Sequence, residues 1–334
     1  GREPAVTPAA SGGRRPRVLL ASGPVGALSP LQASVALARG FADGADVAVI
    51  GLAEGGRALG EVLAEPDGDL EVLHAGWLAR RDGLLAVGAE PDLEPPYDPL
   101  EVSSSPLGRL VAYALQEQPP TRLVIDLTTS NTHDAGRGLL HHVGELRPRL
   151  QGVDVIGVVP SGQQHDRLLG LRGVTSRRGR ELGIALGHVM AVEGTLERFA
   201  LEVDAVAAKA EGAGASGGLG FAILALGGRL VTGAALTAEL GDLDRALGSA
   251  DLVVTGCDSF DFGSRGGGVV AELATRCEAF EVPLVVVSPV VGMSGREMRT
   301  LGIESAHPVP VDEGVADGLT ATGRRLAAGW TSRW

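Results

Sequence analysis

The sequence predicts an α/β fold: a doubly wound, mostly parallel sheet of the flavodoxin or Rossmann type, with a second, inserted α+β domain. Short apolar runs rich in β-branched residues recur along the chain, and stretches with helical spacing of apolar residues separate them. Several runs are followed by small, polar, glycine-bearing loops, which are typical of the ligand-binding edge of a parallel sheet. The chain of 334 residues is long enough for two domains and a sizeable core.

Five apolar runs are predicted to be strands of the main sheet. Their alternation with helical patterns indicates parallel strands that are joined by crossover helices. The runs lie at 18–21, 47–50, 123–127, 251–255 and 284–287.

Seven helices are predicted from apolar residues that recur at spacings of three and four. Several of these segments begin at Ser or Asp followed by Pro or Gly, as helix N-termini do. The predicted helices lie at 30–41, 105–117, 135–144, 178–210, 218–227, 266–280 and 314–329.

The domain boundaries are predicted where the alternation of apolar runs and helical patterns is interrupted. Residues 1–16 carry few large apolar groups and are expected to be a disordered arm. The stretches 61–104 and 151–245 fit the alternation poorly and are expected to form the inserted second domain. The parallel-sheet domain is therefore expected to be discontinuous and to consist of 17–60, 105–150 and 246–334.

Composition excludes several classes of partner. The net charge of −12 argues against nucleic acid and against anionic membrane surfaces, so a small-molecule partner is favoured. No apolar run reaches the length of a bilayer span, and the start lacks the apolar core of a signal peptide, so a cytoplasmic protein is expected. Cys257 and Cys277 are expected to be reduced, and no metal, cofactor or disulfide is expected to be required for folding. The oligomeric state stays open.

Four segments stand out as candidate ligand-binding loops. The loops at 22–29, 128–136 and 256–264 follow predicted strands, and they are expected to line the floor of a cleft. The glycine-rich run at 212–221 precedes a helical pattern and favours a phosphorylated ligand, because backbone N–H groups can converge on an anion there. Close packing of a helix on a sheet explains the same glycines, and both interpretations stay open.

Taken in order, these segments resemble the bacterial two-domain glycerate kinases, across essentially the whole chain after residue 17. The run at 212–221 looks like the glycine signature of that family with a single Ala-to-Ser change. The supporting segments are Asp98-Pro99-Leu100 with Ser103-Ser104, residues 169–173 and residues 301–303.

The chain departs from the family pattern at charged positions. Gly23 stands where the family has an Asp, and the family's Lys is deleted between Val25 and Gly26, while Lys209 is the only lysine of the chain. An acidic pair is replaced within 163–168, and Arg109 stands where the family has a Glu.

The resemblance implies phosphoryl transfer from ATP, with magnesium, to D-glycerate or a related hydroxy acid, giving a phosphoglycerate. Asp134 and Asp261 are then the candidates for base and magnesium ligand, with His133 as an alternative base. Arg172 is the candidate for a bidentate clamp on the substrate carboxylate. The further substrate or nucleotide-binding candidates are Ser29, Glu54, Ser104, Thr132, Gly212, Gly214, Gly217, Gly218, Asp258 and Ser264.

Each role has a structural alternative. Asp134 is suited to cap a helix, Asp261 to close a Gly-Ser turn, and Arg172 to lie in a surface turn. Ser130, His133 and Asp134 lie too close in sequence for a hydrolytic triad without specific geometry. The second functional class is a pseudokinase that binds a small phosphorylated or carboxylate ligand without turnover, because the missing cation and acids are groups that phosphoryl transfer needs.

Overall fold

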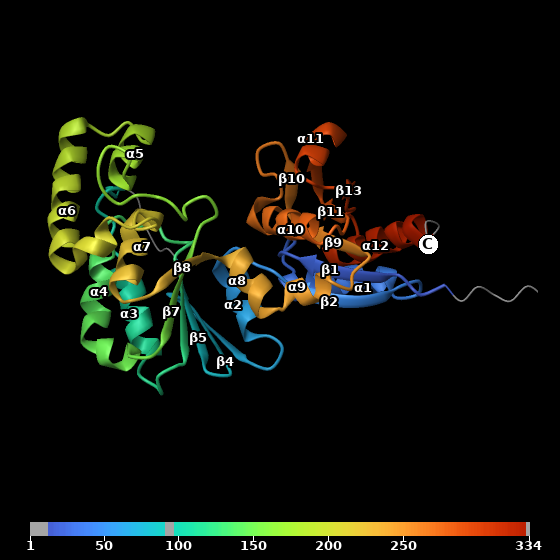
Figure 1. Cartoon of the computed structure of the whole chain (residues 1–334), viewed down its shortest axis with the longest axis horizontal. Helices are drawn as coiled ribbons and strands as arrows, with labels where there is room; N and C mark the ends of the chain where they lie inside the picture. Colours follow the sequence, from blue (N-terminus) through green and yellow to red (C-terminus); the bar gives the residue numbers. More distant parts are fainter. Residues whose placement is uncertain (1–12, 91–96, 332–334) are drawn as a thin grey trace, which may run out of the picture.

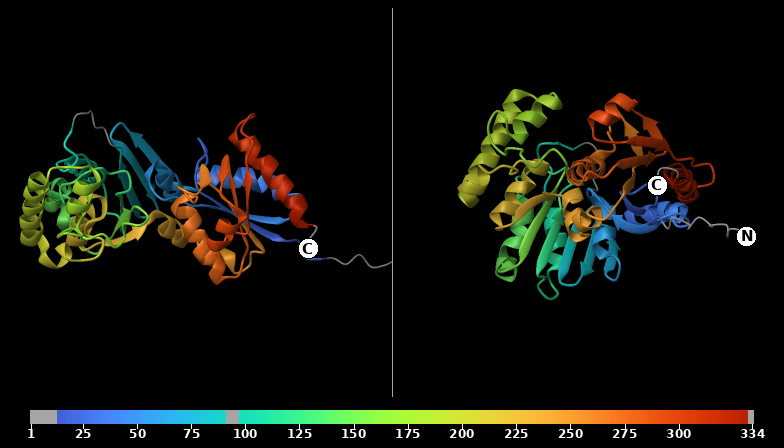
Figure 2. Two further views of the ribbon diagram at one scale, coloured as in Figure 1. Left: turned by 90° about the horizontal axis from the view of Figure 1, so that it is seen from above. Right: turned by 45° about the vertical axis from the view of Figure 1, so that its right-hand side comes forward.

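The computed structural model of the chain describes residues 13–90 and 97–331, and it contains two units that lie side by side (Figure 1). Residues 13–55 and 233–331 form the terminal unit, and residues 56–90 and 97–232 form the inserted unit. Each unit is built on its own sheet, and the two views of Figure 2 show the same separation. None of the helices in the described parts of the chain combines the length and apolar composition that a bilayer span requires.

The terminal unit contains a five-stranded, fully parallel sheet with the order β13-β11-β9-β1-β2. This is the flavodoxin-like order, in which the chain starts at an interior strand, β1, and the sheet extends from it in both directions. The strands are β1 (Arg17–Ser22), β2 (Asp46–Gly51), β9 (Leu252–Gly256), β11 (Leu284–Ser288) and β13 (Ser305–Pro308), and β10 (Ser259–Asp261) pairs with β12 (Val290–Gly292) in a small separate sheet. The helices are α1 (Pro30–Phe41), α8 (Gly233–Leu240), α9 (Leu243–Leu247), α10 (Gly267–Ala279), α11 (Gly295–Thr300) and α12 (Val315–Thr331).

Helices cover both faces of this sheet, as predicted for a doubly wound fold. Leu19 of β1 packs into the apolar cluster that includes residues of α8, α9 and α10. Its neighbour Leu20 packs into the cluster that includes residues of α1 and α12. Successive strand residues point to opposite faces, so a continuous apolar run is needed to fill both cores.

The inserted unit contains a six-stranded mixed sheet with the order β3-β4-β5-β6-β7-β8. The pairs β3–β4 and β4–β5 are antiparallel, and the pairs from β5 to β8 are parallel. The strands are β3 (Asp69–Leu73), β4 (Gly76–Arg81), β5 (Leu84–Ala89), β6 (Arg122–Asp126), β7 (Asp154–Val159) and β8 (Arg229–Thr232). The helices are α2 (Gly56–Ala64), α3 (Ser105–Ala114), α4 (Arg137–Val143), the 3-10 helix Gly144–Leu150, α5 (Val174–Glu181), α6 (Leu186–Ala208) and α7 (Ala215–Ala225).

The predicted grouping of 105–150 in one sheet with 17–60 and 246–334 is wrong. The strand at 123–127 is β6, which pairs with β5 and β7 in the inserted unit. Its apolar run resembles β1 because both strands are buried on two faces, and such a run does not indicate which neighbours it pairs with. The predicted helix at 178–210 is two helices, α5 and α6, because Gly183 takes a φ of 64° after α5 ends.

The first residues of the terminal unit contact its sheet. Arg14 forms an ion pair of 2.7 Å with Asp251, and the Asp46 amide donates to the carbonyl of Pro16. Residues 1–12 of the predicted disordered arm lie outside the described residues.

Two chain connections join the units, and they cross in contact with each other. One runs from β2 to α2 and the other from β8 to α8. A Cβ atom on Gly233 would lie 2.1 Å from the carbonyl oxygen of Glu54, so only a glycine permits this crossing. The Ala53 amide also donates to the Thr237 hydroxyl, at 3.2 Å.

We expect Gly60→Ala to destabilise the protein through Trp77, which is fully buried against α2. A Cβ atom on Gly60 would lie 2.6 Å from Cε3 of the indole, so the ring must move and the free energy of unfolding should fall by about 1–3 kcal/mol. Urea denaturation measures this change. Gly194→Ala in α6 is the matched control, because its Cβ meets nothing within 4 Å and alanine favours helix; an equal or larger loss in the control would contradict the expectation.

Candidate functional site

The loops after β1 and β9 meet where the order of the five-stranded sheet reverses, which is the usual ligand position in such sheets. Asp258 connects the two loops, because its Oδ1 accepts a hydrogen bond of 2.6 Å from the Gly26 amide. The carboxylate of Asp258 thus holds the loop after β1 against the loop after β9.

Three other predicted residues of the terminal unit make local hydrogen bonds. Ser29 caps α1, with its hydroxyl accepting from the Gln32 amide. Asp261 accepts a hydrogen bond of 2.7 Å from the Ser264 amide and one of 3.0 Å from the Ser259 hydroxyl. Both bonds lower the pKa of Asp261, and the bond from the Ser264 amide has the larger effect. Asp261 and Ser264 therefore close a turn, and their roles in catalysis or binding stay predictions.

Glu54 lies where the inserted unit approaches the N-terminus of α10. A Cβ atom on Gly268 would lie 2.2 Å from the Ser161 hydroxyl and 2.5 Å from Oε1 of Glu54. Ser161 follows β7 of the inserted unit, so it contacts the start of α10 across the boundary between the units, and Glu54 of the terminal unit lies beside it. Glu54 is exposed there.

In the inserted unit, the predicted residues Asp134 and Ser104 belong to one hydrogen-bond network. Oδ2 of Asp134 accepts from the Ser104 amide at 2.8 Å, the Ser104 hydroxyl at 2.9 Å and the Gly138 amide at 3.0 Å. Oδ1 accepts from the Gly136 amide at 2.9 Å. The Ser104 hydroxyl in turn accepts from the Leu139 amide. Asp134 therefore joins the N-termini of α3 and α4, where unpaired amides favour a negative charge.

His133 is buried, with 1% of its surface exposed, and both ring nitrogens have partners. Arg178 lies 3.2 Å from Nδ1, and because a guanidinium only donates, Nδ1 must accept. Nε2 therefore carries the proton and donates to the Thr175 hydroxyl at 2.8 Å. Burial first, and then the charge of Arg178, lower the pKa of His133 to about 4. His133 is thus neutral near pH 7, but its basic nitrogen is already occupied.

We expect the stability of the protein to fall with pH between about 6.5 and 4 because of His133. The unfolded state binds a proton in this range and the folded state does not, so protonation favours unfolding by up to about 3 kcal/mol at the lower end. Urea denaturation across this pH range should show the slope in the wild type and a reduced slope in His133→Gln. A wild-type slope that persists unchanged in His133→Gln would contradict the assignment.

The glycine-rich run packs directly against the segment that carries Thr132 and His133. Gly217 has a φ of 66°, and a Cβ atom there would lie 1.7 Å from the carbonyl oxygen of Thr132. The Ser216 hydroxyl donates to the carbonyl of Leu127 at 2.8 Å. Residues 212–220 are all buried, including Gly212, Gly214 and Gly218. This geometry favours close packing, and an anion-binding role stays a prediction.

A cavity of about 300 Å³ opens at the carboxyl ends of β5 and β6, beside the N-terminus of α3. Polar side chains converge on it, among them Ser103, Arg109, Asp126, Thr129, Ser130 and Thr132. Asp126 is 1% exposed and accepts from the Gly56 amide at 2.7 Å and from the Thr128 amide and hydroxyl. Burial raises the pKa of Asp126. The cavity can thus bind a small polar ligand, and the hydrogen bonds of Asp126 hold its wall in place.

Two arginines at the site were not among the predicted binding residues. Arg109 lines the cavity. Arg178 donates to the carbonyl of Thr132 at 3.3 Å as well as to His133, and burial lowers its pKa. Neither contact neutralises its charge. The predicted clamp Arg172 is exposed, so its role stays a prediction.

The residues proposed for magnesium do not fit that ion in this arrangement. The oxygens of Asp134 already accept four hydrogen bonds from α3 and α4. Asp134 lines a cavity whose described walls all belong to the inserted unit, whereas Asp261 lies in the terminal unit. No reaction step is therefore assigned to a magnesium ion on this pair.

Comparison with known proteins decides the family. A profile of the glycerate kinase family matches residues 145–327, more than half of the chain. The chain belongs to the glycerate kinase family. The match extends over parts of both units and includes the glycine-rich run.

Three similar proteins align with most of this chain. An uncharacterized protein of Mycobacterium tuberculosis is 30% identical over 320 residues, covering 87% of this chain and 83% of its own. The glycerate kinase of Bacillus subtilis is 25% identical over 359 residues, covering 90% and 94%. The crystal structure of a Salmonella typhimurium LT2 protein assigned as glycerate kinase 2 matches with a TM-score of 0.77 at 20% identity, covering 96% and 99%, and supports the fold.

Proposed function

We propose that this member of the glycerate kinase family binds D-glycerate or a closely related hydroxy acid in the cavity at the ends of β5 and β6. The observation that carries the proposal is that Arg109 and three hydroxyl-bearing residues, Thr129, Ser130 and Thr132, all line one cavity of about 300 Å³. An arginine suits a carboxylate, and hydroxyls suit the alcohol groups of a small polyol acid. The buried Asp126 forms part of the cavity wall and its bonds fix the loop that carries Thr128.

We further propose ATP as the phosphoryl donor, on the strength of family membership. ATP would supply the phosphoryl group that a substrate hydroxyl accepts. The second candidate is ligand binding without turnover. It is favoured by the two residues expected to act as bases: Asp134 is saturated with hydrogen bonds, and the basic nitrogen of His133 faces Arg178.

The deciding experiment incubates the purified protein with Mg²⁺, ATP and D-glycerate and follows ADP release. D-Lactate, which lacks the terminal hydroxyl, is the control substrate. Turnover that requires D-glycerate supports the kinase, and it excludes the binding-only alternative. Thermal stabilisation by D-glycerate without ADP release supports the binding-only alternative, because a ligand of the native state raises its stability. If D-glycerate produces no turnover and no thermal stabilisation, the proposed ligand is contradicted.

We expect Arg109→Ala to weaken D-glycerate binding by about tenfold or more, because the carboxylate loses a charged partner worth on the order of 1.5–3 kcal/mol. The measurement is a thermal-shift titration with D-glycerate. Arg324→Ala is the matched control, because this exposed arginine lies on α12 of the terminal unit. If the two variants bind D-glycerate with equal affinity, Arg109 does not contact the ligand.

A further inference from the structure

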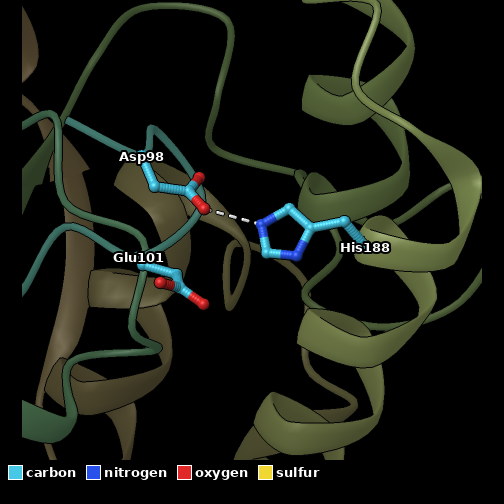
Figure 3. Close-up of side chains that lie close together, drawn as sticks. All are labelled: Asp98, Glu101 and His188. Atoms are coloured by element: carbon cyan, nitrogen blue, oxygen red, sulfur yellow. Dashed lines mark hydrogen bonds and ion pairs between the residues drawn. The ribbon is translucent and has the colours of Figure 1, made fainter. Parts of the chain in front are cut away.

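Asp98, Glu101 and His188 form a cluster of metal-ligating side chains outside the cavity at β5 and β6 (Figure 3). Asp98 and Glu101 lie on the segment between β5 and α3, and His188 lies in the first turn of α6. One ligand atom from each residue can be chosen so that all three lie within 4.8 Å of one another. The cluster thus joins two segments that are about ninety positions apart in the chain.

The geometry of Asp98 and His188 is close to that of two ligands on one ion. Nε2 of His188 lies 2.6 Å from Oδ2 of Asp98, so a single proton now occupies the space between them. A divalent ion bonds such atoms at about 2.0–2.2 Å, and the two atoms need to separate by only a fraction of an ångström to accept it. The other oxygen of Asp98 accepts from the Leu100 amide at 2.9 Å, which orients the carboxylate as an outer-shell bond does.

The third donor completes an open site. The carboxylate of Glu101 is exposed and points toward the pair in Figure 3. Glu101 and His188 also line a cavity of about 290 Å³, which leaves room for a water molecule or a ligand atom in a fourth position. Asp134 borders the same cavity, but its oxygens are occupied by the amides of α3 and α4. Three protein ligands plus one open position is the arrangement of a reactive rather than a purely structural zinc site.

We propose that Asp98, Glu101 and His188 bind a zinc ion. An imidazole nitrogen with two carboxylates suits zinc, whereas magnesium prefers a shell of oxygens and water. The ion also ties α6 to the segment that leads into α3, and metal binding therefore raises the stability of the folded chain. This site does not depend on the proposed function, because none of its three ligands belongs to the proposed glycerate cavity.

The test is isothermal titration of the tag-free full chain with ZnCl₂, and separately with MgCl₂. We expect one zinc ion to bind per chain, and we expect magnesium to bind much more weakly. Glu101→Gln and His188→Gln should each lower the zinc affinity by about tenfold or more, because each removes a direct ligand. Glu101 is exposed, so Glu101→Gln should fold normally, and circular dichroism without metal verifies this for both variants.

His165→Gln is the matched control. His165 faces Glu211 at 3.0 Å on the surface, which makes it an exposed histidine and carboxylate pair outside the cluster. Its replacement should leave the zinc affinity unchanged, and X-ray absorption of the zinc-loaded protein should show one imidazole and carboxylate oxygens around the ion. The absence of zinc binding, or equal zinc affinities in the wild type, Glu101→Gln and His188→Gln, would overturn the proposal, as would equal affinities for zinc and magnesium.

Discussion

Gly217→Ala is expected to cost about 4 kcal/mol or more in the free energy of unfolding, or to prevent folding altogether. Two effects add at this position. An alanine at a φ of 66° is strained, and its Cβ would lie 1.7 Å from the carbonyl oxygen of Thr132 and 2.7 Å from the carbonyl carbon. Both atoms belong to backbone, so the overlap is relieved only if α7 moves away from the strand-end loops.

Gly227→Ala separates the two effects. Gly227 also has a positive φ, 81°, but its Cβ would meet nothing within 4 Å. This control should lose only the strain of the left-handed conformation, about 1–2 kcal/mol. Yield of soluble protein and urea denaturation measure both variants. If the two variants unfold at the same urea concentration, the glycine-rich run is not held by this contact and its packing interpretation is wrong.

Asp134→Ala is expected to lower the free energy of unfolding by about 3–5 kcal/mol. The substitution leaves four donors without their acceptor, at the N-termini of both α3 and α4. Asp134→Asn keeps the shape and one acceptor oxygen, so it should lose roughly half as much. Asp312→Ala, at an exposed position in a loop, is the control and should change little.

These variants also separate a structural from a catalytic role for Asp134. Chemical denaturation gives the stability, and ADP release in the presence of D-glycerate gives any activity. A large stability loss would assign the carboxylate to the helix junction. A loss below about 1 kcal/mol in Asp134→Ala would contradict this and return Asp134 to the list of candidate bases.

The sequence predicts four of the five strands of the terminal sheet, namely β1, β2, β9 and β11, because each is an apolar run that alternates with helical patterns. It does not predict β13, because Ser305–Pro308 contains no apolar run. It does not indicate the partners of β6, since the pairing of Val87 with Ile125 is tertiary information. The strands β3, β4 and β5 were missed because they lie in a stretch marked by prolines and acidic residues. Gly88 there makes room for the indole of Trp77, a contact that no local pattern reveals.

The sequence likewise indicates some residues of the candidate site and not others. The resemblance to the family points to Ser104, Asp134 and Gly217, and the structure brings their segments together, while their roles in binding or catalysis stay predictions. The sequence indicates only a strand position for Asp126, because its neighbours in the run 123–127 are apolar and nothing local marks the carboxylate as part of a site. The position of Arg178 depends on how α5 packs beside His133, which spacing along the chain does not encode.

The crossing of the two connections at Glu54 and Gly233 has a kinetic consequence. Strands β1 and β9 are neighbours, yet Ser22 and Gly256 at their ends are 234 positions apart in the chain. Closing so long a loop is entropically costly unless the intervening residues have already condensed into a body whose entry and exit are adjacent. We therefore expect hydrogen exchange during refolding to show protection of β6 and β7 before β1 and β9. The inserted unit would then fold first and bring the two parts of the terminal unit together.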